Sequence, residues 1–365
     1  MARFRIAMCA VLALTLMTTA GITADLTESL KAGKADLKSA GILTFGPDGV
    51  LFVGDSIGGM IFALDTQDRT ASQATAVEVT GVADKIAAML GTTGDQIQVN
   101  DVAVNQISKK TYVSVSRGLG TAATPVIVRI DPAGKLEALS LDNIRHASVM
   151  LPNPVNASTG GRGGNARLQA ITDLAFVDSR VYVAGLSNEE FSSTLRAIPF
   201  PFSDADKGTN VEFWHGSHNR FETNSPIRTF LPYRVNNEPT ILASYTCTPL
   251  VKVPVSSLKA GSKVMGTTIA EFGAGNTPLD MIAYTKQGKN FILMSNTSRG
   301  VMKFSAEGLD KFEAITARVP DKAGVPYETV ASLTGVVQLD QFDSQRAVVL
   351  TRTGNTLDLR TVALP

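Results

Sequence analysis

A phrase of three apolar segments separated by turns recurs six times along the 365 residues of this chain. The second copy shows the pattern, with NDVAV, TYVSVSR and VIVRID in succession and SKK between the first two. Segments rich in β-branched and aromatic residues and bounded by turn residues are typical of strands. The copies begin near Ile42, Asp101, Asp173, Arg228, Asp280 and Gly335. The phrase therefore predicts a repeated antiparallel sheet.

The repeat interval, 52 to 72 residues, exceeds the roughly 40–50 residues of WD and kelch blades, so insertions are expected. Radial repetition of small sheets around a channel buries such repeats without long exposed edges. From about residue 38 onward the chain resembles propellers of the TolB-like and SMP-30/NHL-like type. The predicted fold class is all-β, a six-bladed β-propeller. Two β-sandwich domains are the alternative, which the common period and the lack of a linker disfavour.

The outermost strand of each blade carries the weakest pattern. Candidates are KLEALSL in the second copy, GTTIAEF in the fourth and FEAITARV in the fifth. Residues 80–90 (TGVADKIAAML) are expected to form a short helix, and GPDG at 46–49 is expected to form a turn.

Residues 1–24 are expected to be a secretory signal peptide. Arg3 and Arg5 precede 12 apolar residues, Ile6 to Met17, and small residues follow. That stretch is too short to span a bilayer, which takes roughly 20 residues. The remainder, 25–365, is predicted to be a single exported propeller domain. A periplasmic and an extracellular destination both remain open.

Composition excludes several classes of function. The net charge of +1, with both signs dispersed, gives no indication of nucleic acid or of an anionic membrane surface. No later stretch of the chain approaches transmembrane length. Cys247 is the single cysteine after the signal, so no internal disulfide is expected. Nucleotide, flavin and haem motifs are absent from the sequence.

Aligning the copies brings polar residues of distant segments together. The propeller resemblance implies that loops entering the first strand and leaving the second share one face. The expected hard-cation ligands, for an ion such as Ca²⁺, are Asp101, Asp173, Asp280, Asn100 and Asn296. Two alternatives remain: Arg228 neutralises the acids, or the acids cap strand ends and bond to neighbouring-blade amides.

A second constellation is FWHGSHNRFETN at 213–224, expected to be the connection entering the fourth blade and to overhang the same face. Its histidines could join other soft ligands around copper or zinc. The soft-cation candidates are His215, His218, Cys247 and Met281. A lone cysteine in a β-core is also commonly a small hydrophobe, and Trp214 could simply pin the loop by packing.

The leading hypothesis is an exported propeller that binds a small ligand or a metal ion at one mouth of its channel, without established catalysis. Candidate ligand-binding residues are Arg228, Trp214, Arg117 and Arg352. One alternative is a metal-dependent hydrolase of the lactonase or esterase type that uses the channel-mouth carboxylates. The other is a platform for protein partners.

Overall fold

The structure is a computed structural model that describes residues 26–157, 165–247 and 249–365. The predicted signal peptide lies outside the described residues, as does the centre of the glycine-rich segment that follows Pro152. Strands account for most of the regular structure, which confirms the all-β class. No helix in the described ranges is long and apolar enough to cross a membrane.

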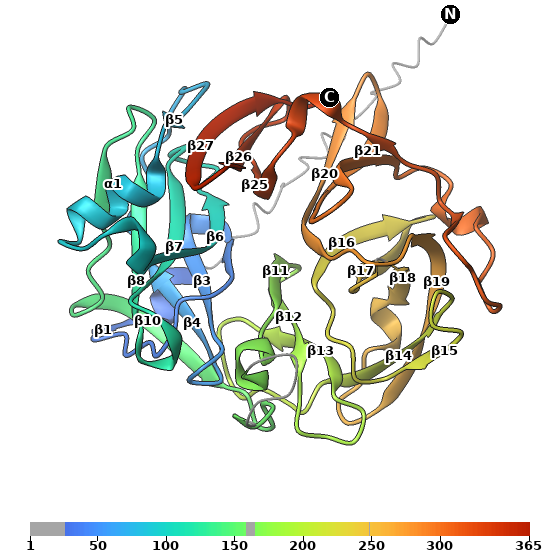
Figure 1. The fold of residues 1–365 in the computed structure, drawn as a ribbon. Coiled ribbons are helices and arrows are strands. Elements are labelled where there is room, and N and C mark those ends of the chain that lie inside the picture. Colours follow the sequence, from blue (N-terminus) through green and yellow to red (C-terminus); the bar gives the residue numbers. More distant parts are fainter. Residues whose placement is uncertain (1–25, 158–164, 248) are drawn as a thin grey trace, which may run out of the picture.

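Six inner strands surround a central cavity (Figure 1). They are β2 (Leu43–Phe45), β6 (Ile97–Val104), β11 (Asp173–Val177), β16 (Thr229–Val235), β20 (Pro278–Lys286) and β25 (Val336–Gln341). Each begins one antiparallel unit, and the units are numbered first to sixth in chain order. Their starts lie close to the six repeat starts predicted from the sequence.

Each inner strand pairs with a second strand, which pairs with a third. The second strands are β3 (Val50–Asp55), β7 (Thr111–Arg117), β12 (Arg180–Leu186), β17 (Glu238–Ser244), β21 (Lys289–Asn296) and β26 (Arg346–Thr353). The third strands are β4 (Met60–Asp65), β8 (Thr124–Ile130), β13 (Ser193–Pro199), β18 (Pro249–Pro254), β22 (Gly300–Ser305) and β27 (Thr356–Ala363).

The outer strands are less regular. Four units take theirs from the segment that follows: β9 (Leu136–Ala138), β14 (Thr209–His215), β19 (Lys263–Phe272) and β24 (Glu328–Thr329). The predictions for KLEALSL and GTTIAEF are thus confirmed by β9 and β19. The prediction for FEAITARV is wrong, because β24 completes the fifth unit instead. Two short strands, β15 (Arg220–Glu222) and β23 (Lys322–Gly324), extend β14 and β19.

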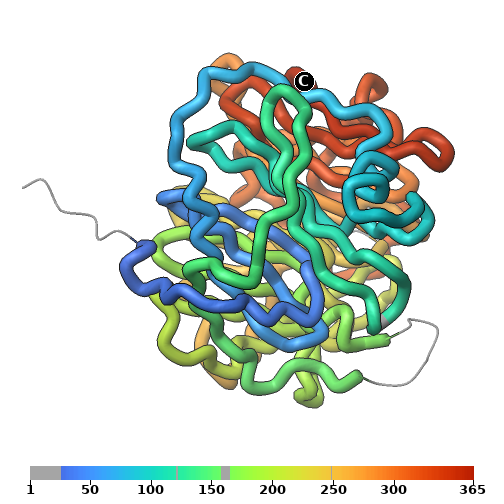
Figure 2. The backbone as a smooth tube through the Cα atoms, turned by 90° about the vertical axis from the view of Figure 1, so that its left-hand side faces the viewer, coloured from blue at the N-terminus to red at the C-terminus, as the bar shows by residue number. Residues whose placement is uncertain are grey.

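The remaining two units borrow their outer strands from elsewhere in the chain. The first unit is completed by β10 (Ile144–Met150), which pairs with β4, and by β1 (Lys31–Gly33) beyond it. The sixth is completed by β5 (Glu78–Val79), which pairs with β27. Figure 2 shows the green segment after the second unit running onto the blue first unit.

Neighbouring inner strands do not follow chain order throughout. β2 of the first unit contacts β6 and β11, while β6 of the second unit contacts β25 of the sixth. Around the ring the units therefore run second, first, third, fourth, fifth, sixth, and back to the second (Figure 1). The first two units have exchanged the places that a sequential propeller would give them.

Apolar faces of neighbouring units pack together to form the core. Phe52 of β3 stacks on Phe176 of β11 at 5.1 Å between ring centroids and meets Phe200 edge-on at 4.9 Å. The predicted helix is α1 (Val82–Met89), which buries Val82 and Ile86 against the second and sixth units. Asp48 and Gly49 have positive φ of 59° and 69°, as expected of the predicted GPDG turn.

Candidate functional site

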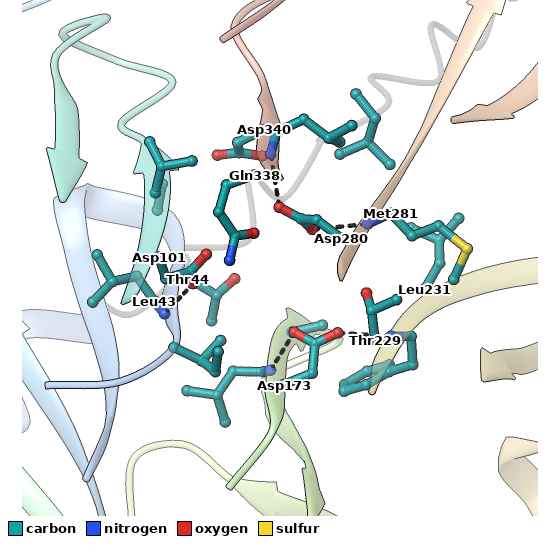
Figure 3. A pocket seen from close by; sticks show the side chains of 18 of the residues that line it. Leu43, Thr44, Asp101, Asp173, Thr229, Leu231, Asp280, Met281, Gln338 and Asp340 are labelled. Carbon is teal, nitrogen blue, oxygen red and sulfur yellow. Dashed lines mark hydrogen bonds between the residues drawn. The ribbon is translucent and has the colours of Figure 1, made fainter. Parts of the chain in front are cut away.

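Four aspartates ring the central cavity, whose volume is about 470 Å³ (Figure 3). They are Asp101 of β6, Asp173 of β11, Asp280 of β20 and Asp340 of β25. The sequence predicted the first three together and missed the fourth. Each carboxylate accepts a backbone N–H from the inner strand of a neighbouring unit.

The hydrogen bonds of the ring follow one scheme. Asp173 accepts the N–H of Leu174 at 2.8 Å and that of Phe230 in the fourth unit at 2.7 Å. In the same way, Asp280 joins Met281 to Leu339, Asp340 joins Gln341 to Val104, and Asp101 accepts the N–H of Leu43 at 2.7 Å. The acids thus link the third unit to the fourth, the fifth to the sixth, the sixth to the second, and the second to the first.

β-Bulges position two of these acids. The register of β6 shifts between Val99 and Asp101, and that of β20 shifts between Pro278 and Asp280. A bulge re-aims the residue that follows it, here toward the cavity. The bulge in β25 lies between Val336 and Gln338, so Gln338 occupies the equivalent place in the sixth unit.

Enclosure raises the pKa of every acid in the ring. Loss of solvation raises the pKa of Asp173 to about 7 and that of Asp340 to about 6. Desolvation also raises the pKa values of Asp101 and Asp280 well above the usual range. Repulsion from Asp173 and Asp340 adds to both, and repulsion from Asp101 adds to the shift of Asp280. The carboxyls face a cavity that could hold water.

The hard-cation ligand set predicted from the sequence is only partly assembled. Asn100 donates its side-chain N–H to the carbonyl of Ala40 and to the Ser116 hydroxyl. Asn296 is the buried last residue of β21, where its side chain donates to Asn276, and it does not line the cavity. Both oxygens of Asp173, Asp280 and Asp340 already accept backbone N–H groups. As arranged, the set does not fit a Ca²⁺ ion, which takes six to eight oxygen ligands.

A second cavity of about 450 Å³ opens at the end of the channel where the inner strands begin. Hydroxyl and amide side chains line it, among them Ser39, Gln98, Asn100 and Gln169. Arg228 is the single charged residue among the described residues of its wall, and it also borders the central cavity.

The guanidinium of Arg228 is mostly enclosed by protein. Its Nε is buried and has no hydrogen-bond partner among the described residues. Burial lowers the pKa of the guanidinium, and no carboxylate of the described chain lies within ion-pair distance of it. The neutralisation of the acids by Arg228 that the sequence suggested is therefore not formed. The side chain is left as an available cation at the channel mouth.

The other predicted ligand-binding residues lie outside this mouth. Arg117 is exposed at the end of β7, and Arg352 is exposed in a separate groove that Asp84 and Asp95 share. Trp214 donates its indole N–H to the carbonyl of Ala317 at 3.0 Å and packs edge-on against Phe221. Trp214 thus pins its loop by packing.

The structure brings together His215, His218 and Cys247, whose ligating atoms all lie within 4.8 Å of one another. Segment 213–224 is not a simple connection, because β14 and β15 form a hairpin there as part of the third unit. None of the three residues lines either channel cavity. Met281, the fourth soft ligand predicted, instead lies on β20 at the central cavity (Figure 3).

No protein-family model matches this chain, and no curated protein matches its sequence. Among solved structures, one that is similar is a putative oxidoreductase (glucose dehydrogenase) of Thermus thermophilus, at 13% identity and TM-score 0.38, covering 91% of this chain and 100% of that one. The PQQ-bound aldose sugar dehydrogenase of Streptomyces coelicolor is 12% identical, with TM-score 0.34 and coverage of 91% and 96%. Hydrazine synthase of Kuenenia stuttgartiensis is 11% identical, with TM-score 0.34 and coverage of 91% and 97%. Similarity at this level carries no information about ligand or activity.

Proposed function

We propose that this protein is an exported β-propeller that binds a small organic anion at the mouth of its channel. The observation that carries the proposal is the isolation of Arg228: among the described residues it is the one charged group lining a polar cavity, and its buried Nε has no partner among them. A buried N–H without an acceptor is unfavourable by about 1–3 kcal/mol, and a ligand oxygen could supply that acceptor.

The surroundings favour an anion with further polar groups. A planar guanidinium matches carboxylate and phosphate geometry, and hydroxyl and amide side chains can bond to the rest of a polar ligand. Below the mouth, the carboxylates of the aspartate ring that are ionised make the channel interior unfavourable for negative charge. An anionic group would therefore stop at Arg228, at the mouth, and would not pass further down the channel. Catalysis is not part of the proposal.

Export is proposed on the sequence alone. The positively charged start, the short apolar stretch and the small residues around Ala20 and Ala24 support a cleaved signal. The ligand would then be met in the periplasm or outside the cell.

The test is calorimetric binding of a panel of small carboxylates, phosphate esters and neutral sugars to the mature protein. Replacing Arg228→Gln should weaken binding of the anion by about 10–100-fold, because a hydrogen bond to a charged group contributes about 1.5–3 kcal/mol. Arg228→Lys keeps the charge without the planar fork, so its affinity should be intermediate. Arg352→Gln, an exposed arginine in another groove, is the matched control.

Thermal melts of each variant separate a loss of binding from a loss of folding. Equal anion affinity in wild type and Arg228→Gln would show that the anion binds elsewhere. Tighter binding of neutral sugars than of anions, with the same sugar affinity in wild type and Arg228→Gln, would also exclude the anion proposal.

A further inference from the structure

His215, His218 and Cys247 lie apart from the channel, where the β14–β15 hairpin of the third unit meets the fourth unit (Figure 1). His215 ends β14, His218 is in the turn that follows, and Cys247 is in the loop after β17. Two loops that are distant in sequence thus present two imidazoles and a thiol to one another.

The spacing is close to what one ion requires. With metal–nitrogen distances of about 2.0–2.1 Å and metal–sulfur distances of about 2.3 Å, tetrahedral ligand atoms lie about 3.3–3.6 Å apart. The three atoms are already within 4.8 Å of one another. Shifts of about 1 Å in side chains would complete the contact, and His218 has room to move because its side chain is 44% exposed.

The ring nitrogens of His215 are available to bind a metal ion. Its side chain is only 2% exposed, and neither ring nitrogen makes a hydrogen bond in the described chain. Nδ1 lies 3.5 Å from Glu222 Oε1, and Nε2 lies 4.0 Å from Glu271 Oε2. A neutral imidazole offers the lone pair that a metal needs. Burying both nitrogens unpaired is otherwise unfavourable.

Two carboxylates, Glu222 and Glu271, lie beside the histidines. His218 Nδ1 lies 2.8 Å from Glu222 Oε1, which leaves Nε2 available as a ligand. Glu271 is fully buried; its Oε1 accepts the N–H of Gly216 at 2.5 Å and its Oε2 accepts the Ser217 hydroxyl at 3.3 Å. Histidine ligands of metals commonly donate their second nitrogen to a carboxylate, and the contact between His218 and Glu222 has this form.

We propose that His215, His218 and Cys247 form a binding site for one thiophilic transition-metal ion, of the class of Zn²⁺ or Cu⁺. Thiolate and imidazole are the ligands that these ions prefer over Ca²⁺ or Mg²⁺. The half-exposed His218 and the partly exposed Cys247 give the ion a path from solvent. Three protein ligands leave a fourth position open to water or another small ligand. The site does not depend on the anion site at Arg228.

The experiment uses the mature protein, stripped with a chelator and then titrated separately with Zn²⁺, Cu⁺ and Co²⁺. One ion per chain is expected, and Co²⁺ should produce a thiolate-to-cobalt charge-transfer absorption. Cys247→Ser should abolish that absorption, and Cys247→Ser or His218→Gln should weaken Zn²⁺ or Cu⁺ binding by at least about 100-fold. Glu222→Gln, which removes a supporting carboxylate, should weaken binding by about 10-fold.

The third histidine of the chain provides the control. His146 lies on β10, bonded to the carbonyl of Ile144, and is not part of the cluster. His146→Gln should bind the ion as tightly as wild type does. The proposal is overturned if no ion binds with one-to-one stoichiometry. It is also overturned if Cys247→Ser and His218→Gln, both folded by circular dichroism, keep wild-type affinity. The relative affinities for Zn²⁺ and Cu⁺ identify which ion the site prefers.

Discussion

Protonation of the aspartate ring should make the fold more stable at mildly acidic pH. The folded-state pKa of Asp173 is about 7, whereas its ordinary value is 3.8. Where a carboxyl is protonated in the folded state and ionised in the unfolded state, stability falls as pH rises. The contribution of Asp173 is therefore fully present below about pH 4 and is lost as pH rises through about 7.

The size of the effect follows from the pKa difference. One pKa unit corresponds to about 1.4 kcal/mol, so Asp173 should contribute about 3 kcal/mol of pH dependence between about pH 4.5 and about pH 7.5. Asp340, whose pKa is about 6, should add about 2 kcal/mol over the same interval. Carboxylates whose pKa is lowered, such as Asp68 with its partner Lys110, exert their effect below this interval.

The assay is urea unfolding of wild type and Asp173→Asn across this pH range. Asparagine cannot ionise, so the difference in unfolding free energy between the two proteins isolates Asp173 from other groups that titrate in the same interval, such as Glu271 with a pKa of about 7. That difference should change by about 3 kcal/mol from one end to the other. Asp178→Asn, in the exposed turn after β11, is the control and should run parallel to wild type.

Parallel curves for wild type and Asp173→Asn would refute the reasoning, because they would mean that Asp173 ionises at its ordinary pKa. The same titration with added Ca²⁺ tests the hard-cation hypothesis for the ring. If curves that diverge in its absence become parallel in Ca²⁺, a bound cation is neutralising the acids.

Two further predictions concern burial. Phe52→Ala should lower the unfolding free energy by about 3–5 kcal/mol, because it empties the centre of the Phe176–Phe200 cluster; a loss below about 1 kcal/mol in urea unfolding would contradict this packing. Asn153→Ala should lower the unfolding free energy by about 2–4 kcal/mol. Asn153 Oδ1 accepts a hydrogen bond from the Arg196 guanidinium at 2.8 Å, and the Arg196 side chain is wholly buried. An unchanged melting temperature for Asn153→Ala would show that another acceptor replaces it.

The repeated phrase predicted the local structure well because hairpins are encoded locally. An apolar segment, a turn and a second apolar segment suffice to specify β2 with β3 or β20 with β21. The same alignment missed Asp340 for a physical reason. After the bulge in β25, the position equivalent to Asp101 and Asp280 is Gln338, and the acid comes two residues later on the same side of the strand.

The sequence pattern could not predict which units lie next to each other in the ring. Repeats with one period look alike wherever they sit in the ring, so the exchange of the first two units leaves no local signal. The outer strands β5 and β24 are two residues long, and such short edges carry little alternation to detect. The approach of His215 to Cys247 was a hypothesis from residue type, and it depended on how the third and fourth units dock.

The exchange of the first two units also interlocks the chain. The strand that completes the sixth unit comes from residues 78–79, far before its partner β27 in the sequence. The first unit is completed only by residues 144–150, which follow the second unit in the sequence. Neither the first nor the sixth unit is a contiguous piece that could be removed, duplicated or transplanted whole. Duplication of a single repeat would separate strands that pair across distant parts of the sequence. We therefore expect such a chain to lengthen through its loops and not through added blades. The pairing of β5, from the early part of the chain, with β27, its last strand, closes the ring.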